Sequence, residues 1–152
     1  MERITYLNRY RVVADATGAS VVVRRSGAAV TCKAAEIRTG KEIALEVIPA
    51  FGLSEATRAD LQEEADAAKE ISHINIPALH DFGIEGEQLF YAWENFDGTS
   101  AEEWVESHGS MPIGPVLRIA LQVASALTAV CKVERDVPMS DSVDAAVRYD
   151  AA

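Results

Sequence analysis

The sequence predicts an α+β fold, with a twisted antiparallel sheet of about five strands, one helix packed on it and further helices after it. Ile43, Leu45 and Val47 alternate with side chains of different character, as in a strand with two distinct faces. After Ser54 the period becomes helical, and apolar residues recur at Leu61, Ala65, Ala68 and Ile71. A second helical pattern, apolar around most of its circumference, covers residues 113–130. Strands followed by helices are typical of the α+β class.

Turn and capping residues place the other elements. Ser54 is one candidate N-cap for the first helix, and Thr57 with Asp60 is the other. In chain order we expect strands at 10–16, 19–24, 30–34 and 43–48, a helix at 54–71, a hairpin over 79–93 that turns at 85–86, a short helix at 100–106, a longer helix from 112 or 113 to about 131, and a loosely held tail at 134–152.

Length and composition describe one globular domain. The chain has 152 residues, of which 49% are hydrophobic, and its formal net charge is −10 with a pI of about 4.7. This acidic balance argues against nucleic acids and anionic membranes as partners. We expect no membrane span, because no apolar run approaches the ~20 residues that cross a bilayer. The N-terminal residues also lack the apolar stretch of a secretion signal.

The cysteines and histidines do not indicate a metal site or a disulfide. Cys32 and Cys131 both lie in apolar patterns, far apart in the sequence, and we interpret them as reduced core thiols of a cytoplasmic protein. His73, His80 and His108 have no partners at metal-ligand spacing. We therefore expect neither a metal nor another cofactor.

Motifs spread along the chain are similar, in order and spacing, to those of one enzyme family. A turn at 39–40 leads into Ile43, Ala44, Leu45, Glu46 and Val47, which match the strand pattern [VI]-A-[LI]-K-V except at the fourth place. Other matching segments are residues 30–34, 72–76, 81–83, 88–95 and 113–130. Together they cover roughly residues 20–130 and resemble the N-lobe of a bacterial serine/threonine protein kinase, its hinge, and the first long C-lobe helix.

The resemblance implies a domain organisation and a nucleotide cleft. It implies an N-lobe-like domain with hinge over residues 1–98, C-lobe-like helices over 99–133, and a tail over 134–152. The chain is far shorter than a whole kinase, so the resemblance is to a truncated and degenerate form. The positions that correspond to the nucleotide cleft are Thr31, Ala44, Glu46, Glu64, Trp93, Glu94 and Phe96.

Glu46 is the most informative of these positions. In kinases this strand carries a lysine that holds the nucleotide phosphates and pairs with a glutamate on the following helix. Counting back from His73 places that glutamate at Glu64, so the acidic half of the ion pair is retained. Two carboxylates ~4 Å apart repel by about 4 kcal/mol at an effective dielectric near 20. We expect them to splay apart or to share a proton, and neither arrangement attracts a triphosphate.

The glycine loop and the metal-binding motif are degenerate as well. The glycine loop corresponds to residues 23–30, where only Gly27 remains and where Arg24 and Arg25 are interpreted as surface arginines. Asp81-Phe82-Gly83 precedes the fifth kinase-like strand, whereas a metal-binding D-F-G follows the catalytic loop. We therefore expect Phe82 to pack within a strand and Asp81 to bind no metal.

The remaining catalytic positions have no convincing substitutes. Lys33 is a faint candidate to replace the missing lysine, whereas Lys41 is expected on the surface. Residues 134–136 have the composition of a catalytic loop, but they follow the long helix too closely and lack the later lysine and asparagine. Trp93 corresponds to the residue behind the adenine pocket, and an indole would fill space that ligands use. We expect no catalytic residues.

The sequence thus predicts a catalytically inactive kinase-like domain that acts by binding another protein, including a kinase. Two alternatives remain open: an N-terminal fragment of a kinase-like protein, and a nucleotide-binding regulatory domain with unorthodox phosphate contacts. The long helix from Ile113 to Val130 has a polar stripe of only Arg118, Gln122 and Ser125. Because so apolar a helix needs a cover, we expect a homodimer formed through it.

Overall fold

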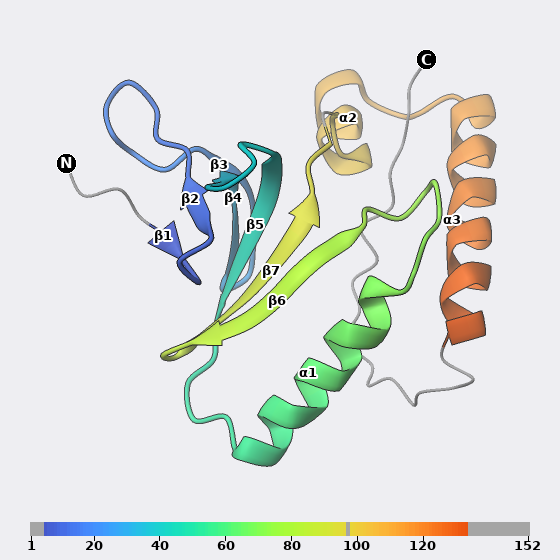
Figure 1. Cartoon of the computed structure of the whole chain (residues 1–152). Helices are drawn as coiled ribbons and strands as arrows, with labels where there is room; N and C mark the ends of the chain where they lie inside the picture. Colours follow the sequence, from blue (N-terminus) through green and yellow to red (C-terminus); the bar gives the residue numbers. More distant parts are fainter. Residues whose placement is uncertain (1–4, 97, 134–152) are drawn as a thin grey trace. The chain divides into compact units, whose positions relative to one another are not determined.

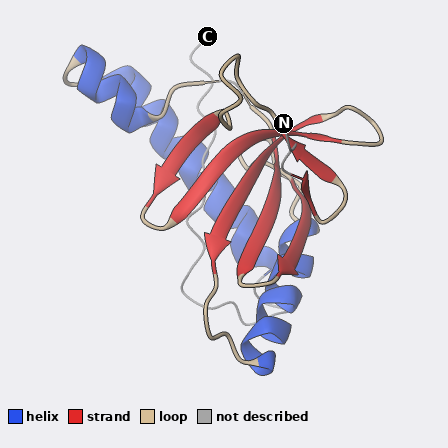
Figure 2. Ribbon diagram, turned by 90° about the vertical axis from the view of Figure 1, so that its left-hand side faces the viewer, coloured by secondary structure: helices blue, strands red, loops and turns tan. Residues whose placement is uncertain are grey.

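The computed structural model describes residues 5–96 and 98–133 as a curled antiparallel sheet with three helices, which confirms the α+β prediction (Figures 1 and 2). The sheet order is β1-β2-β4-β5-β7-β6, and β3 pairs with β4 off this path. The strands are β1 Thr5–Tyr6, β2 Tyr10–Val12, β3 Val22–Ser26, β4 Ala29–Glu36, β5 Glu42–Pro49, β6 Leu79–Glu85 and β7 Gln88–Glu94.

The sheet contains seven strands rather than about five, because the N-terminal segment pairs more extensively than its alternation suggests. β1 and β2 form a hairpin through Tyr6 and Tyr10, with Leu7 and Asn8 in the left-handed backbone region at φ 52° and 50°. The strand expected over 10–16 ends at Val12, and the strand expected over 19–24 begins at Val22. A single bridge joins Ala14 to Ser20 around the turn at Gly18.

Helix α1, Glu55–Lys69, begins where the sequence predicts. The Ser54 hydroxyl accepts the Thr57 amide hydrogen at 3.1 Å, so Ser54 is the N-cap. Helix α2, Ala101–His108, starts with a reciprocal capping box between Ser100 and Glu103. Helix α3 is Ile113–Val133. The tail at 134–152, including the segment weighed as a catalytic loop, lies outside the described residues.

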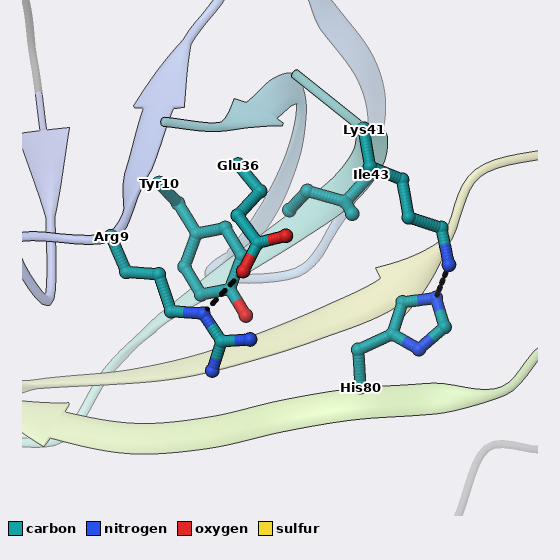
Figure 3. Close-up of a pocket in the computed structure, with 6 residues that line it drawn as sticks. All are labelled: Arg9, Tyr10, Glu36, Lys41, Ile43 and His80. Atoms are coloured by element: carbon teal, nitrogen blue, oxygen red, sulfur yellow. Dashed lines mark hydrogen bonds and ion pairs between the residues drawn. The ribbon is translucent and has the colours of Figure 1, made fainter. Parts of the chain in front are cut away.

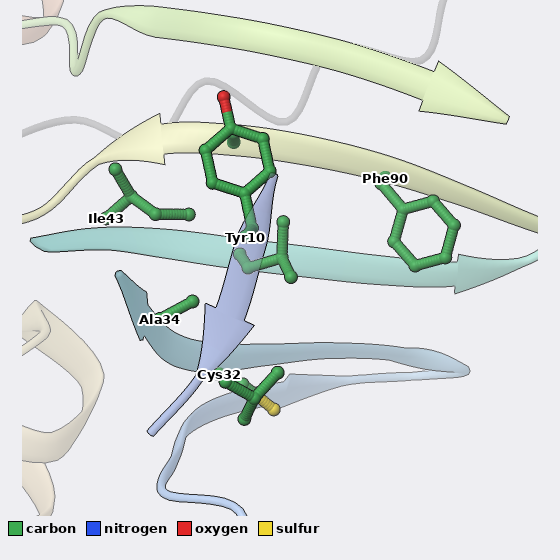
Figure 4. Close-up of a cluster of buried hydrophobic side chains, with 8 residues drawn as sticks. Tyr10, Cys32, Ala34, Ile43 and Phe90 are labelled. Carbon is green, nitrogen blue, oxygen red and sulfur yellow. The ribbon is translucent and has the colours of Figure 1, made fainter. Parts of the chain in front are cut away.

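Alternation along the strands divides the apolar side chains between the two faces of the sheet. One face holds a cluster formed by β2, β4, β5 and β7 (Figure 4), whose buried members are Tyr10, Val12, Cys32, Ala34, Ile43, Leu45, Phe90 and Ala92. The other face packs against α1 through Ala50, Ala65, Leu79, Phe82 and Leu89, with Leu61 and Ala68 at the margin. The predicted stripe on α1 therefore does face the sheet.

The chain divides into two compact units. One comprises residues up to Lys69 together with Leu79–Asn95, and so contains the sheet and α1. The other comprises Glu70–Ala78 and the residues from Phe96 onward, with α2 and α3. Within the second unit, the His73 ring lies 3.0 Å from the Ser125 hydroxyl through Nε2, and its Nδ1 accepts the Asn75 amide hydrogen at 3.1 Å. This histidine therefore fixes the loop before β6 against α3.

Two expectations about the C-terminal helix were wrong. Cys131 is exposed and free, so it is not a core thiol, whereas Cys32 is buried as expected. The stretch Ile113–Lys132 is long and apolar enough to cross a membrane, by length and composition alone, although no such run was expected. Arg118 and Gln122 interrupt the apolar residues of this stretch, but its mean hydropathy remains as high as that of a membrane span. Core helices of soluble proteins have the same length and composition.

Candidate functional site

The sheet face that packs on α1 carries most of the residues expected at the nucleotide cleft. In the register of the sheet, Glu46 on β5 lies between Thr31 on β4 and Tyr91 on β7. Two residues along, Ala44 lies between Lys33 and Trp93, on the same face. Glu64 projects from α1, which packs on this face.

One of the expected cleft residues, Glu94, lies on the opposite face of the sheet. Glu94 pairs with Ile43, and both therefore face away from the side that carries Glu46 and Trp93. Phe96 is 45% exposed and belongs to the second unit. The structure thus brings together the expected strand positions of the cleft and α1, whereas Glu94 faces the other side of the sheet.

Glu46 is held by the neighbouring tryptophan. The Trp93 indole N–H donates to Glu46 Oε2 at 3.0 Å, and both residues are partly buried. Trp93 also stacks on Tyr91, with ring centroids 6.0 Å apart and an interplanar angle of 12°. An indole N–H is only a donor and an ammonium is only a donor, so Trp93 can satisfy a glutamate at position 46 but not a lysine.

Tyr91 lies within the influence of both carboxylates of the expected pair. Burial raises the pKa of the Tyr91 hydroxyl, and the negative charges of Glu46 and Glu64 raise that pKa further. Both carboxylates therefore act on the same phenol. The Trp93 indole satisfies one oxygen of Glu46 in this partly buried setting.

Lys33, the faint candidate to replace the lysine, is paired with another carboxylate. Lys33 Nζ lies 3.0 Å from Glu42 Oε2, and Glu42 is two residues along β5 from Ala44, the cross-strand partner of Lys33. Glu42 and Glu46 lie on the same face of β5, and Lys33 is paired with Glu42 rather than directed to Glu46.

The segment expected to form the glycine loop is a tight hairpin. Ser26 pairs with Ala29, so β3 and β4 are joined by two residues, Gly27 and Ala28. Gly27 has φ 55°, which a two-residue hairpin turn favours. Gly27 is the only glycine in residues 23–30, so the close approach of backbone to phosphate that glycines permit is limited to one position.

Asp81, Phe82 and Gly83 lie within β6, as the sequence predicts, and each has a structural contact. Asp81 Oδ2 accepts hydrogen bonds from Arg9 Nη1 at 2.8 Å and from the Tyr10 hydroxyl at 3.2 Å. Phe82 is 5% exposed in the cluster facing α1. A Cβ added to Gly83 would lie 2.7 Å from Leu7 Cδ1, so the glycine makes room for Leu7.

These contacts fasten the β1–β2 hairpin to the sheet, and sequence reasoning did not find them. The Leu7 amide donates to Glu85 Oε2 at 3.0 Å, and Tyr6 packs on Phe90 with centroids 4.6 Å apart. Arg9 also donates through Nε to Glu36 Oε1 at 2.8 Å. Arg9 and Asp81 are 72 residues apart, and no local pattern reports a contact at that separation.

A small polar pocket of about 200 Å³ opens beside this hairpin (Figure 3). Its lining comprises Arg9, Tyr10, Glu36, Lys41, Ile43 and His80. Lys41 Nζ lies 3.1 Å from His80 Nε2, and burial followed by the Lys41 charge lowers the pKa of His80. Within residues 5–96 and 98–133, no group of three or more His, Cys, Asp or Glu side chains could hold a metal ion.

The sheet and its packed helix have the fold of a protein-kinase N-lobe, and sequence similarity to a serine/threonine kinase supports a protein-kinase-like family. The chain is 30% identical over 106 residues to serine/threonine-protein kinase PknD from two strains of Mycobacterium tuberculosis. That match covers 69% of this chain and 16% of PknD, so the chain matches about a sixth of the length of these relatives.

A solved structure shows the same fold. The chain superimposes on the crystal structure of Rad53 1-466 in complex with AMP-PNP with a TM-score of 0.66 and 20% identity. This superposition covers 82% of this chain and 30% of the Rad53 chain. No protein-family model matches the sequence.

Proposed function

We propose that this chain is a catalytically inactive, kinase-like domain that does not use ATP and acts by binding protein. The observation that carries the proposal is the hydrogen bond between Trp93 and Glu46, at the strand position where kinases have their phosphate-binding lysine. The Glu46 carboxylate has a dedicated hydrogen-bond donor in the Trp93 indole, and that donor could not bind a lysine at the same position.

The electrostatics of the cleft face support the same proposal. Glu42 and Glu46 lie on one face of β5, and Lys33 on the neighbouring strand is paired with Glu42. Residues 23–30 keep one glycine, Gly27, where a kinase phosphate-binding loop uses several. A nucleotide triphosphate would therefore gain few donors there and would meet repulsion.

Two alternatives rest on specific observations. A nucleotide-binding regulatory role would need a cation on the cleft face. Arg24 can supply one, because it is the cross-strand partner of Thr31, which in turn pairs with Glu46. A part of a longer serine/threonine kinase-like protein is compatible with the 16% coverage of PknD. The second alternative concerns the length of the protein, so it can be true together with an inactive cleft.

Thermal-shift titration with ATP, with and without magnesium, tests the proposal. A ligand at 100 times its Kd stabilises a fold by about 2.7 kcal/mol, which is several degrees in Tm for a domain of this size. We expect no magnesium-dependent rise in Tm at millimolar ATP. Glu46→Lys is expected to form an ion pair with Glu64 without restoring phosphate transfer.

We further propose that the chain is a homodimer through α3. Several large apolar side chains on this helix are more than two-fifths exposed in the single chain: Ile113, Val116, Leu117, Leu121 and Leu127. Residues Ile113–Val133 contain no acidic side chain, and only Arg118 and Lys132 are basic. Two such helices can pair by their apolar stripes without bringing many like charges together.

A further inference from the structure

Strand β3 is an open edge of the sheet. It pairs with β4 on one side, and all five of its residues are exposed. Among the residues that the structure describes, no strand pairs with its other side along Val22–Ser26. Val22 and Val23 are 38% and 54% exposed. An edge of this kind presents backbone donors and acceptors to which another extended chain can add.

The edge is basic in a strongly acidic chain. Arg24 and Arg25 are adjacent in β3, and neither forms a salt bridge with any residue that the structure describes, whereas the whole chain carries a net charge of −10. Their cross-strand partners are Thr31 and Val30, so the two guanidinium groups project to opposite faces of the strand.

The two arginines favour an acidic strand as the binding partner of this edge. Two β3 edges paired with each other would place arginines opposite or diagonal to arginines, and like charges in cross-strand positions are destabilising. An acidic strand would instead place a carboxylate beside each guanidinium, one on each face of the extended sheet. The register shift between Val22 and Arg24 limits regular pairing to a short stretch, so recognition concentrates at the two arginines.

We infer that β3 binds an extended acidic segment of another protein, which adds as a strand and places consecutive carboxylates opposite Arg24 and Arg25. The exposed valines supply the apolar contacts next to this charged pair. The inference rests on the proposed role in protein binding, and it names the surface and the chemistry of the partner. Arg24 projects on the face that carries Glu46 and Arg25 on the opposite face, and the surface is separate from the apolar stripe of α3.

The test uses a synthetic ten-residue peptide with a central Glu-Glu pair flanked by valine and threonine, titrated into the full chain by calorimetry. We expect binding that weakens with salt, and deuterium exchange that slows at residues 22–26. The variant Arg24→Gln with Arg25→Gln should weaken binding at least tenfold. The control variant, Arg11→Gln with Arg38→Gln, removes the same charge at exposed positions outside β3 and α3 and should change the Kd less than twofold.

Peptide variants separate strand addition from simple charge attraction. A peptide with Gln-Gln at its centre should bind at least tenfold more weakly, and one with proline on both sides of Glu-Glu should not slow exchange at β3. Absence of binding at millimolar peptide would overturn the inference, as would equal binding by the double arginine variant or binding without exchange protection of β3. None of these results bears on ATP, so a failure here is distinguishable from a failure of the proposed inactive cleft.

Discussion

The Trp93 indole nitrogen lies 3.0 Å from Glu46 Oε2, joining β7 to β5 through two side chains that are 47 residues apart in the sequence. The bond pairs a donor-only group with an acceptor-only group in a partly buried setting, where an unpaired polar group costs about 1–3 kcal/mol. Glu46 and Trp93 therefore form one structural unit.

The contact of Asp81 with Arg9 and Tyr10 predicts that Asp81→Asn is destabilising. Asp81 is 22% exposed at its side chain and also lies 4.0 Å from Lys69 Nζ at the end of α1. Loss of the charge should lower the free energy of unfolding by about 1–2 kcal/mol. The loss is no larger because Arg9 is half exposed and solvent weakens its attraction to Asp81. Denaturant unfolding measures this change in free energy.

Asp66→Asn is the control, because Asp66 is 59% exposed and its substitution should change the free energy of unfolding by less than about 0.5 kcal/mol. Equal effects of both variants would show that the hairpin contact is unimportant.

The contact between Gly83 and Leu7 predicts a coupled pair of positions. Gly83→Ala should destabilise the fold by about 1–3 kcal/mol, because the new methyl group would overlap the Leu7 side chain. The same change in a Leu7→Ala background should cost much less, and a double-mutant cycle measures the difference. Gly114→Ala is the control: nothing lies within 4 Å of its Cβ position, so it should be neutral or slightly stabilising. Additive effects of Leu7→Ala and Gly83→Ala would contradict this packing.

The pocket predicts a pH dependence of stability through His80. Burial and the Lys41 charge lower the pKa of His80 in the folded chain, although Glu94 and Glu36 raise it and Arg9 lowers it further. Between the folded pKa and about 6.5, the unfolded chain binds a proton that the folded chain does not, so stability rises with pH through this window and is lost as pH falls through it.

His80→Gln keeps an acceptor for Lys41 but cannot titrate. The Tm of the wild type should therefore fall relative to that of His80→Gln as the pH is lowered from 7.5 to about 5. The variant Lys41→Gln should show a weaker pH dependence of Tm than the wild type, because it removes the positive charge next to the His80 imidazole. Parallel Tm profiles for the wild type and His80→Gln over this range would refute the assignment.

The proposed α3 interface predicts that association depends on Leu121, which is 72% exposed in the single chain. Sedimentation equilibrium at micromolar concentration should show a dimer for the wild type and a folded monomer for Leu121→Glu, because a glutamate in an apolar interface is costly. Ile74→Glu is a matched control, since Ile74 is 83% exposed and lies outside α3. A folded wild-type monomer at these concentrations would refute the interface.

Local patterns predicted those elements whose side chains follow a regular period. The alternation at Ile43, Leu45 and Val47 predicted β5, and the stripe through Leu61, Ala65 and Ala68 predicted the buried face of α1. Order along the chain also placed Phe82 within a strand, because a D-F-G before the fifth kinase-like strand cannot follow a catalytic loop.

Contacts between distant segments could not be read from the sequence. The β1–β2 hairpin depends on Leu7 entering the space left by Gly83 and on Arg9 reaching Asp81, and neither residue belongs to a periodic pattern. The partner of Glu46 depended on strand register, which decides that Trp93 and Tyr91 share its face while Glu94 does not. Exposure of Cys131 was missed because α3 is apolar on sides that the single chain leaves uncovered.

Isothermal titration of ATP with magnesium into the wild-type chain tests the central claim most directly, because it measures binding without requiring catalysis. The carboxylate of Glu46 held by Trp93, the engagement of Lys33 with Glu42 and the single glycine, Gly27, in residues 23–30 together predict no saturable heat at millimolar ATP. A saturable, magnesium-dependent isotherm with a Kd below about 1 mM, which corresponds to more than about 4 kcal/mol of binding free energy, would contradict the claim.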